Sequence, residues 1–529
     1  MNTIASWLAA ASGLLGFLAS SAAQPLSVEH LRESVRHATG WETLPKTASG
    51  GVMLSGTTNT LSIDADATLL FDYSGHLSLQ QSGLIPMTRS IGSSGPWMLD
   101  IGGEFRGLSL GEGEDLIILA QVISGQWAFE SSPLRLEIDQ ARTSPEKVVA
   151  TFVLPGPGGE PLVTHGEIDV DRKTWKPTAC RVHAGKDTTT ITFGGSAMLD
   201  EVWFPAEVTI AAKSSNSSFH FAKAAPAPTF VRSPYDPPRP IGSRPTDVVF
   251  DRAVPSILER RRAKTGHSLV KVLIDSKPGW FIFDTGAGAT VIDQTFADSI
   301  ALKPFGSVEA VGVGGSVTTA FVRSKSLTVG PATLTDPLMA RLDLSKIGAA
   351  IGEDLAGVLG YNVMHRSIAK LHTDDGTVEL FDPATFDDKG LAWFPLTVYE
   401  RHACIEAAFE DHRGIFKLDT GAGVLPVSMH APAVVRLKLL EGRQTQDGHA
   451  GGVGGRVAVK TGSLRWLEIG GRREENVPAN FALEPKGALA DEFTLGNLSP
   501  RQIGPRDIVF DYVGGRIAYP ERKPAPESK

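Results

Sequence analysis

The sequence predicts a mainly β protein built from several domains. At 529 residues the chain is too long for a single hydrophobic core, so we expect two to four domains. Its 56 Gly and 34 Pro indicate many turns, which favour short strands over long helices. An internal repeat adds a third observation, since WFIFDTGAGATVID at 280–293 returns as GIFKLDTGAGVLPVS at 414–428. Together these features predict a β-rich N-terminal domain followed by two related lobes.

The N-terminus has the pattern of a secretory signal. The first 28 residues carry no charged side chain, an apolar run extends from Ile4 to Leu18, and small residues follow at 21–23. This pattern predicts a signal peptide over 1–23 with cleavage after Ala23, and hence an exported protein, periplasmic or secreted. The alternative is an uncleaved membrane anchor, for which the apolar run is short.

Charge and cysteine content exclude two classes of function. A net charge of −8 provides no basic surface, so we expect no nucleic-acid partner. The two cysteines, Cys180 and Cys404, are far apart in the chain. They predict two buried, unpaired thiols rather than a disulfide framework or a cysteine-rich metal site.

Residues 24–223 are expected to form the β-rich N-terminal domain. A short helix is predicted over Ser27–Thr39, with Ser27 as its N-cap and Leu31 and Val35 on one face. Alternating runs of strand length follow, separated by Gly clusters. The stretches GEIDVDRKTWKPTACRVHAG and ITFGGSAMLDEVWFPAEVTI resemble the half-open β-barrel of periplasmic lipoprotein-carrier proteins. That resemblance implies a lipid or acylated ligand on a concave apolar face; the alternative is a packing or docking domain.

The segment 224–245 contains seven prolines and is expected to be a semi-rigid linker. Beyond it the repeat predicts a first lobe over 246–392 and a second over 393–521, with a tail at 522–529. Four pairs of landmarks recur at nearly constant spacing: Asp284 and Asp419 (135), Gly314 and Gly454 (140), Gly360 and Gly496 (136), and Gly376 and Gly515 (139).

In each copy an apolar strand ends at Asp-Thr-Gly in a tight turn. The glycines at 286, 288, 421 and 423 are expected to permit φ > 0 and a close approach of the backbone. Thr285 and Thr420 carry stiff side chains whose hydroxyls can donate and accept hydrogen bonds across a seam between the lobes.

Two DTG motifs, followed downstream by VLG at 358–360 and TLG at 494–496, resemble the pepsin/retropepsin aspartic proteases. The Ala after each DTG is more similar to the retroviral branch. The resemblance covers about Val248 to Tyr519 and implies a bilobal, double β-barrel-like fold. A dinucleotide loop is excluded because GxGxxG would need Gly or Ala where Val291 and Pro426 stand. No HExxH or GxSxG occurs, and Asp293 is the only further acid near the first turn, so we expect no metal and no cofactor.

The resemblance implies that Asp284 and Asp419 are the catalytic residues of an aspartic endopeptidase. Two such carboxyls share one proton in this family and activate a water molecule between them. Thr285, Gly286, Thr420 and Gly421 would support them. The substrate would be a peptide or protein, and one chain carrying both lobes would be active as a monomer. The alternative is a catalytically silent peptide- or lipid-binding periplasmic protein that uses the N-terminal domain.

Two Gly-rich segments, 311–322 and 451–459, are predicted to be hairpins. The resemblance places the first as a flap over the substrate, with Val313, Gly314 and Gly315 at its tip, while we expect the second to be structural or a surface turn. Lys417, two residues before Asp419, is expected to extend to solvent rather than to act on the aspartate.

Overall fold

The computed structural model describes residues 25–44, 50–108, 110–155, 161–184, 187–212, 215–423 and 426–521. The expected signal peptide at 1–23 and the tail at 522–529 lie outside the described residues. The described chain is mainly β, which confirms the predicted fold class. Within it, no helix has the length and apolar character needed to cross a membrane.

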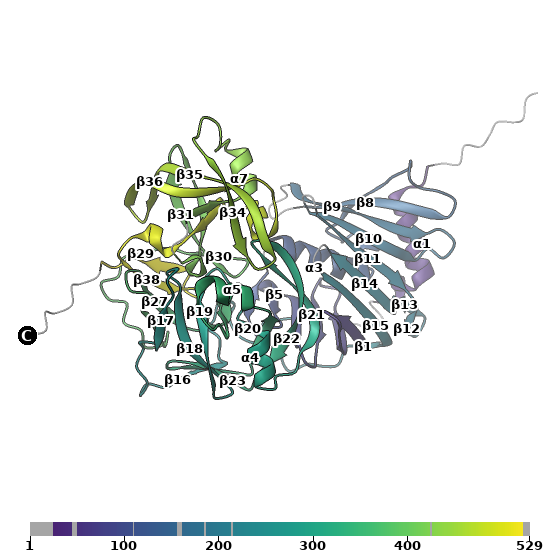
Figure 1. The fold of residues 1–529 in the computed structure, drawn as a ribbon. Helices are drawn as coiled ribbons and strands as arrows, with labels where there is room; N and C mark the ends of the chain where they lie inside the picture. Colours follow the sequence, from purple (N-terminus) through teal and green to yellow (C-terminus); the bar gives the residue numbers. More distant parts are fainter. Residues whose placement is uncertain are drawn as a thin grey trace, which may run out of the picture.

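The N-terminal half forms one antiparallel sheet, drawn in purple to blue in Figure 1. Its strands are β1 (Val52–Thr60), β2 (Ile63–Phe71), β3 (Leu77–Gln81), β4 (Met87–Gly92), β5 (Gly95–Leu99), β6 (Phe105–Gly107), β7 (Arg135–Ile138), β8 (Lys147–Pro155), β9 (Pro161–Asp171), β10 (Pro177–Ala184), β11 (Asp187–Gly194), β14 (Glu207–Ala212) and β15 (Ser215–Pro226). Their order is β6-β5-β4-β3-β2-β1-β15-β14-β11-β10-β9-β8-β7, and β12 (Ala197–Leu199) and β13 (Val202–Phe204) form a separate hairpin. β15 ends at Pro226, inside the stretch expected to be the linker.

Two helices pack their apolar side chains against this sheet, α1 (Val28–Thr39) and α3 (Leu110–Ile123). The hydroxyl of Ser27 accepts a hydrogen bond from the N–H of His30, and Leu31 and Val35 are buried, which confirms the helix predicted from the sequence. Cys180 lies in the same core, and neither it nor Cys404 is in a disulfide, as predicted.

The first lobe is an eleven-stranded sheet with the order β16-β24-β23-β18-β19-β26-β20-β25-β22-β21 and β17 paired to β18. Its strands are β16 (Val248–Phe250), β17 (Arg260–Arg262), β18 (Ser268–Ile274), β19 (Lys277–Phe283), β20 (Val291–Asp293), β21 (Phe305–Gly312), β22 (Gly315–Arg323), β23 (Ser326–Val329), β24 (Ala332–Thr335), β25 (Leu338–Leu342) and β26 (Gly357–Leu359).

The second lobe is an eight-stranded sheet with the order β30-β31-β32-β37-β33-β36-β35-β34. Its strands are β30 (Thr397–Tyr399), β31 (His402–Phe409), β32 (His412–Leu418), β33 (Val427–Met429), β34 (Gln446–Gly452), β35 (Gly455–Ile469), β36 (Arg472–Ala482) and β37 (Gly496–Leu498). The run β18-β19-β26-β20-β25-β22-β21 of the first lobe matches β31-β32-β37-β33-β36-β35-β34 strand for strand. β19 pairs β26 in parallel as β32 pairs β37, so the sequence repeat is a repeat of topology.

A five-stranded sheet joins the lobes, with the order β28-β27-β38-β39-β29. Its strands are β27 (Ile368–His372), β28 (Val378–Phe381), β29 (Trp393–Pro395), β38 (Asp507–Asp511) and β39 (Arg516–Ala518). One apolar core runs through both lobes and this sheet, and Phe281, Phe416 and Phe510 are fully buried in it. The short helices of the two lobes are α4 (Gln294–Ser299), α5 (Ser345–Ile351), α6 (Tyr361–Met364), α7 (Ala431–Arg436), η4 (Thr420–Ala422), η5 (Gly487–Ala490) and η6 (Pro500–Ile503).

The N-terminal half contacts both lobes. In Figure 1 its sheet lies beside β21 and β22, and Ile63 and Ile85 share a buried apolar cluster with Phe321 and Leu338 of the first lobe. The hydroxyl of Tyr361 donates a 2.5 Å hydrogen bond to Glu104 of the N-terminal half. Arg401 at the start of the second lobe also pairs with Glu104 and with Asp100.

Candidate active site

The two DTG turns begin where buried strands end. β19 finishes at Phe283, directly before Asp284, and β32 finishes at Leu418, directly before Asp419. The N–H of Asp284 donates to the carbonyl of Leu359 (3.0 Å), and the N–H of Asp419 donates to the carbonyl of Leu498 (2.8 Å). Because each aspartate is tied to the central strand of its own lobe, its position is fixed by the core behind it.

The structure brings the two carboxyls together at the seam between the lobes. They are hydrogen-bonded to each other, although their residues are 135 positions apart in the sequence (419 − 284). The N–H groups of Gly286 (2.7 Å) and Gly421 (3.2 Å) both donate to Oδ1 of Asp284. Nδ2 of Asn497 donates to Oδ2 of Asp419 at 3.2 Å.

Burial and mutual repulsion make the pair retain a proton. Burial is the largest cause and the neighbouring carboxylate the second in raising the pKa of Asp284 well above its usual range. Burial also raises the pKa of Asp419, against the hydrogen bonds from Asp284 and Asn497. Since the carboxyls are in contact, their titration belongs to the pair, and burial with mutual repulsion favours a state in which the two share one proton.

Thr285 and Thr420 interlock the lobes, as the sequence led us to expect. The hydroxyl of Thr285 donates to the carbonyl of Leu418 (2.5 Å) and accepts from the N–H of Thr420 (3.1 Å). In return the hydroxyl of Thr420 donates to the carbonyl of Phe283 (2.8 Å) and accepts from the N–H of Thr285 (2.9 Å). Both threonine side chains are buried, so these four bonds lie out of water.

The glycines of the two DTG turns are needed mainly because other atoms lie close to them, and less because of their backbone dihedral angles. Only Gly423 has a positive φ, of 58°, so the expectation of φ > 0 is wrong for Gly286, Gly288 and Gly421. For Gly421 the reason is that residues 420–422 form the 3₁₀ turn η4, which needs no left-handed residue.

A side chain at either DTG glycine would strike the opposite aspartate. A Cβ on Gly286 would lie 2.5 Å from Cγ of Asp419, and one on Gly421 would lie 2.3 Å from Cγ of Asp284. Both distances are far inside van der Waals contact, so only glycine allows the two carboxyls to meet.

The predicted hairpin at 311–322 is present as β21 and β22, with Val313 and Gly314 in its turn. β34 and β35 form the second hairpin, for which a structural role or a surface turn is expected; its tip is largely exposed, and it touches the tip of the first hairpin. The N–H of Gly314 donates to the carbonyl of Val453 (2.9 Å), and a Cβ on Gly314 would lie 2.1 Å from the backbone nitrogen of Gly455. Gly315, the last of the expected tip residues, opens β22 with a φ of 128°.

Both hairpins and the turn that carries Asp284 pack against the same buried apolar cluster. Ala310 of the first hairpin and Val453 of the second pack in one apolar cluster with Ala287, the residue after the first DTG, and with Ile347 of α5. All four are only partly buried, so each leaves apolar area exposed.

Lys417 differs from its prediction. Its side chain is 7% exposed, and Nζ lies 2.6 Å from Oδ2 of Asp491, which is as deeply buried. The lysine therefore ends in an internal ion pair rather than in solvent or at Asp419. The partner is 74 positions later in the chain (491 − 417), and no local pattern identifies it.

Asn497 was not identified from the sequence. It directly follows Gly496, the downstream landmark of the second copy, and its counterpart after Gly360 is Tyr361. A polar residue next to that landmark is a signal that could have pointed to it. The repeat is asymmetric here, since Asn497 binds the dyad whereas Tyr361 binds Glu104 of the N-terminal half.

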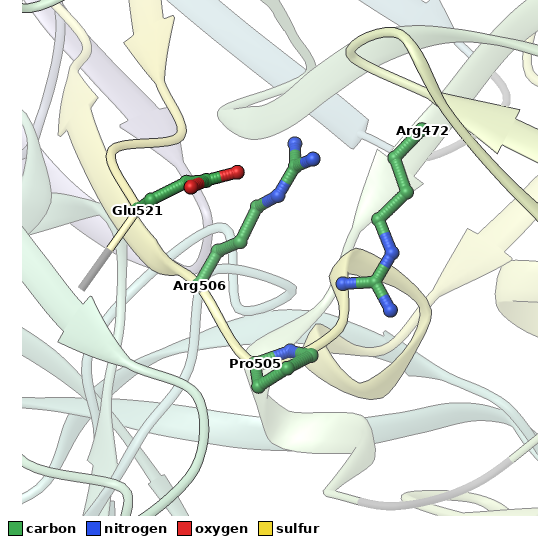
Figure 2. Close-up of a pocket in the computed structure, with 4 residues that line it drawn as sticks. All are labelled: Arg472, Pro505, Arg506 and Glu521. Atoms are coloured by element: carbon green, nitrogen blue, oxygen red, sulfur yellow. The ribbon is translucent and has the colours of Figure 1, made fainter. Parts of the chain in front are cut away.

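A surface pocket of about 420 Å³ is lined by Arg472, Pro505, Arg506 and Glu521, whose side chains are drawn in Figure 2. None of these residues belongs to a DTG turn or to either hairpin, so the pocket is separate from the candidate site. Among the described residues, no group of three or more His, Cys, Asp or Glu side chains is placed to hold a metal ion.

Two carboxyls in contact, one from each copy of the repeat, can hold a shared proton for acid–base chemistry. Residues 270–363 match the family model of aspartyl proteases, a stretch that includes Asp284, the first hairpin and Gly360. The match supports an aspartic protease family for this protein. A search of curated proteins gives no match to the chain.

Proposed function

We propose that the protein is an aspartic endopeptidase of the pepsin/retropepsin type, which hydrolyses peptide bonds with a water molecule held between Asp284 and Asp419. The observation that carries the proposal is the contact of these two carboxyls, one from each copy of the repeat. Because a single chain supplies both, no second subunit is needed, and we infer that the monomer is active.

The chemistry needs one proton on the pair. The ionised carboxyl takes a proton from the water, whose oxygen attacks the carbonyl carbon of the scissile bond. The protonated carboxyl polarises the carbonyl oxygen and, as the C–N bond breaks, a proton passes to the leaving amine. Neither carboxyl is assigned one role, since the shared proton belongs to both.

We infer that the substrate lies as an extended strand beneath the two hairpins, held by main-chain hydrogen bonds. The tips touch in the structure, so they must separate to admit a peptide, a motion of the μs–ms kind that Gly-rich tips allow. The partly buried surface of Ala287, Ala310, Ile347 and Val453 favours an apolar substrate side chain next to the scissile bond.

The remaining expectations from the sequence stay proposals. Export to the periplasm or outside the cell depends on residues 1–23, and a lipid or acylated ligand depends on the resemblance of the N-terminal half to lipoprotein carriers. We place the peptidase first because the contact between the carboxyls of Asp284 and Asp419 supports it.

The test is cleavage of a peptide library by the full-length chain across pH, with products identified by mass spectrometry. We expect cleavage by the wild type and a loss of about 10⁴-fold in rate for both Asp284→Asn and Asp419→Asn. Asp275→Asn is the matched control, because Asp275 lies in the β18–β19 turn with a φ of 47°, which Asn also tolerates. Equal cleavage by wild type and the two dyad variants would end the proposal.

A further inference from the structure

A histidine precedes each aspartate of the dyad by 17 residues, His267 before Asp284 (284 − 267) and His402 before Asp419 (419 − 402). His267 lies directly before β18, and His402 opens β31, the equivalent strand of the second lobe. The local sequences, TGHSLVKV and ERHACIEA, share little else besides apolar positions. The pair therefore belongs to the repeat, yet the chemistry of the dyad does not use it.

His267 reaches across the seam to the turn of the other lobe. Its Nε2 lies 2.8 Å from the carbonyl oxygen of Gly421, and Nδ1 lies 2.8 Å from the hydroxyl of Thr265. A carbonyl oxygen can only accept, so Nε2 carries the hydrogen and the Thr265 hydroxyl can donate to Nδ1. The segment that carries His267 packs closely against the second DTG turn, because a Cβ on Gly423 would lie 2.4 Å from the carbonyl oxygen of Thr265.

His402 makes the reciprocal contact from the second lobe to the first. Its Cε1 lies 3.6 Å from the place of a Cβ on Gly288, and the backbone of Gly286, after that of Tyr399, is a polar neighbour of the imidazole. Among the described residues, the buried Nδ1 of His402 has no hydrogen-bond partner, and no contact of His402 is as short as the 2.8 Å bond of His267, so the contact from the second lobe is the looser of the two.

Both imidazoles are neutral at ordinary pH. Burial is the main cause that lowers the pKa of His267, and burial lowers the pKa of His402 to about 4. A neutral imidazole can donate from one nitrogen to a carbonyl without placing a full positive charge beside the dyad.

Gly286 and Gly421, the two glycines that the histidines contact, donate hydrogen bonds to the same oxygen atom. The N–H groups of Gly286 and Gly421 both donate to Oδ1 of Asp284, at 2.7 and 3.2 Å. Hydrogen bonds to a carboxylate favour its ionised form, so these two donors oppose the effect of burial on the dyad. Their aim depends on the position of glycines from two different lobes.

We propose that His267 and His402 are positioning residues, which clamp Gly421 and Gly286 across the seam and so keep both glycine N–H groups on Oδ1 of Asp284. The expected effect on kcat rests on the proposed function, whereas the expected effect on the titration of the dyad does not. Each lobe thereby orients the turn of the other, in addition to the interlock of Thr285 and Thr420.

The test compares His267→Leu with His267→Gln in the full-length chain. The Gln amide nitrogen can donate from about the place of Nε2, whereas Leu keeps the volume and removes the donor. We expect kcat of the Leu variant to fall about 10- to 100-fold, with KM changed less than about threefold. The reason is that displaced glycine N–H groups would alter the position of the dyad more than the binding of the peptide. The acidic limb of its pH–rate profile should move to higher pH, and the Gln variant should restore both properties.

His402→Leu and His402→Gln should behave in the same way, with a smaller effect because the contact is looser. His37→Leu is the control, since His37 lies exposed on α1 of the N-terminal half. Leu variants that lower only the melting temperature, with kcat and the acidic limb unchanged, would overturn the proposal in favour of plain seam stability.

A second measurement separates this inference from the peptidase proposal. Carbon-13 NMR of aspartate-labelled protein follows the titration of the dyad whether or not any peptide is cleaved. We expect the apparent pKa of the pair to rise in His267→Leu and to stay near the wild-type value in His267→Gln. An unchanged titration in the Leu variant would refute the clamp, even if the wild type proves to be an active peptidase.

Discussion

Removing the hydroxyl of Thr285 tests how the two lobes are held together. Thr285→Val keeps the shape of the side chain and deletes one bond to the carbonyl of Leu418 and one from the N–H of Thr420. Thr285 is 1% exposed, so water cannot replace the lost partner at either group. Each buried group left unpaired costs about 1–3 kcal/mol, which predicts a loss of about 2–6 kcal/mol in the free energy of unfolding.

Native-state amide hydrogen exchange is the assay, because it reports the free energy of opening at individual amides of the seam. We expect faster exchange at the N–H of Thr420, together with a lower urea midpoint. Thr328→Val is the matched control, since its hydroxyl bonds only the side chain of Thr333 on a half-buried strand. A loss of less than about 0.5 kcal/mol for Thr285→Val, equal to the control, would refute the reasoning.

Two further changes test the hairpins and a buried histidine. Gly314→Ala would bring a Cβ to 2.1 Å from the backbone of Gly455, so the tips could no longer close over a bound peptide. KM for a peptide should therefore rise at least about tenfold, whereas Gly50→Ala, with open space around it, should be neutral. An unchanged KM in Gly314→Ala would contradict the contact of the tips. His372 lies between two carboxylates, and its hydrogen bond to Glu379 is the main cause that raises its pKa. Its stabilising effect is therefore complete below the unfolded pKa of about 6.5 and is lost as pH rises through the higher folded pKa. In urea unfolding between pH 6 and 8, His372→Gln should show a weaker dependence on pH than the wild type, and equal slopes would count against this pairing.

Much of the fold of the two lobes could be predicted, because the internal repeat is visible in the sequence. Apolar strands that end at Asp284 and Asp419, with glycines at matching distances behind them, require two similar sheets. The seam threonines and the first hairpin followed from the same alignment of the two copies. These features depend on local pattern and on symmetry, both of which one sequence displays.

The rest depends on contacts between distant segments that no local pattern encodes. Lys417 resembles a surface lysine until the fold places Asp491 beside it. The contact between the two hairpin tips could not be predicted, because nothing in the residues of the second hairpin shows that Val453 meets Gly314. The prediction of positive φ for the DTG glycines was wrong for another reason. A glycine can be required either by a left-handed backbone or by crowding, here from the opposite aspartate, and the sequence does not distinguish the two.

The contacts between the N-terminal half and the two lobes also could not be predicted from the sequence. Glu104 is buried and binds Tyr361, which directly follows the landmark Gly360, yet neither residue carries a pattern that joins them. A buried acid of this kind is recognised only when its partner from another domain is in place.

The shared proton of Asp284 and Asp419 is the centre of this account, and the pH dependence of kcat/KM for peptide cleavage tests it most directly. We expect a bell-shaped profile, with activity rising as the first carboxyl ionises and falling as the last shared proton is lost at a pH well above the usual range of an aspartate. A profile with no descending limb, or one left intact in Asp419→Asn, would contradict it.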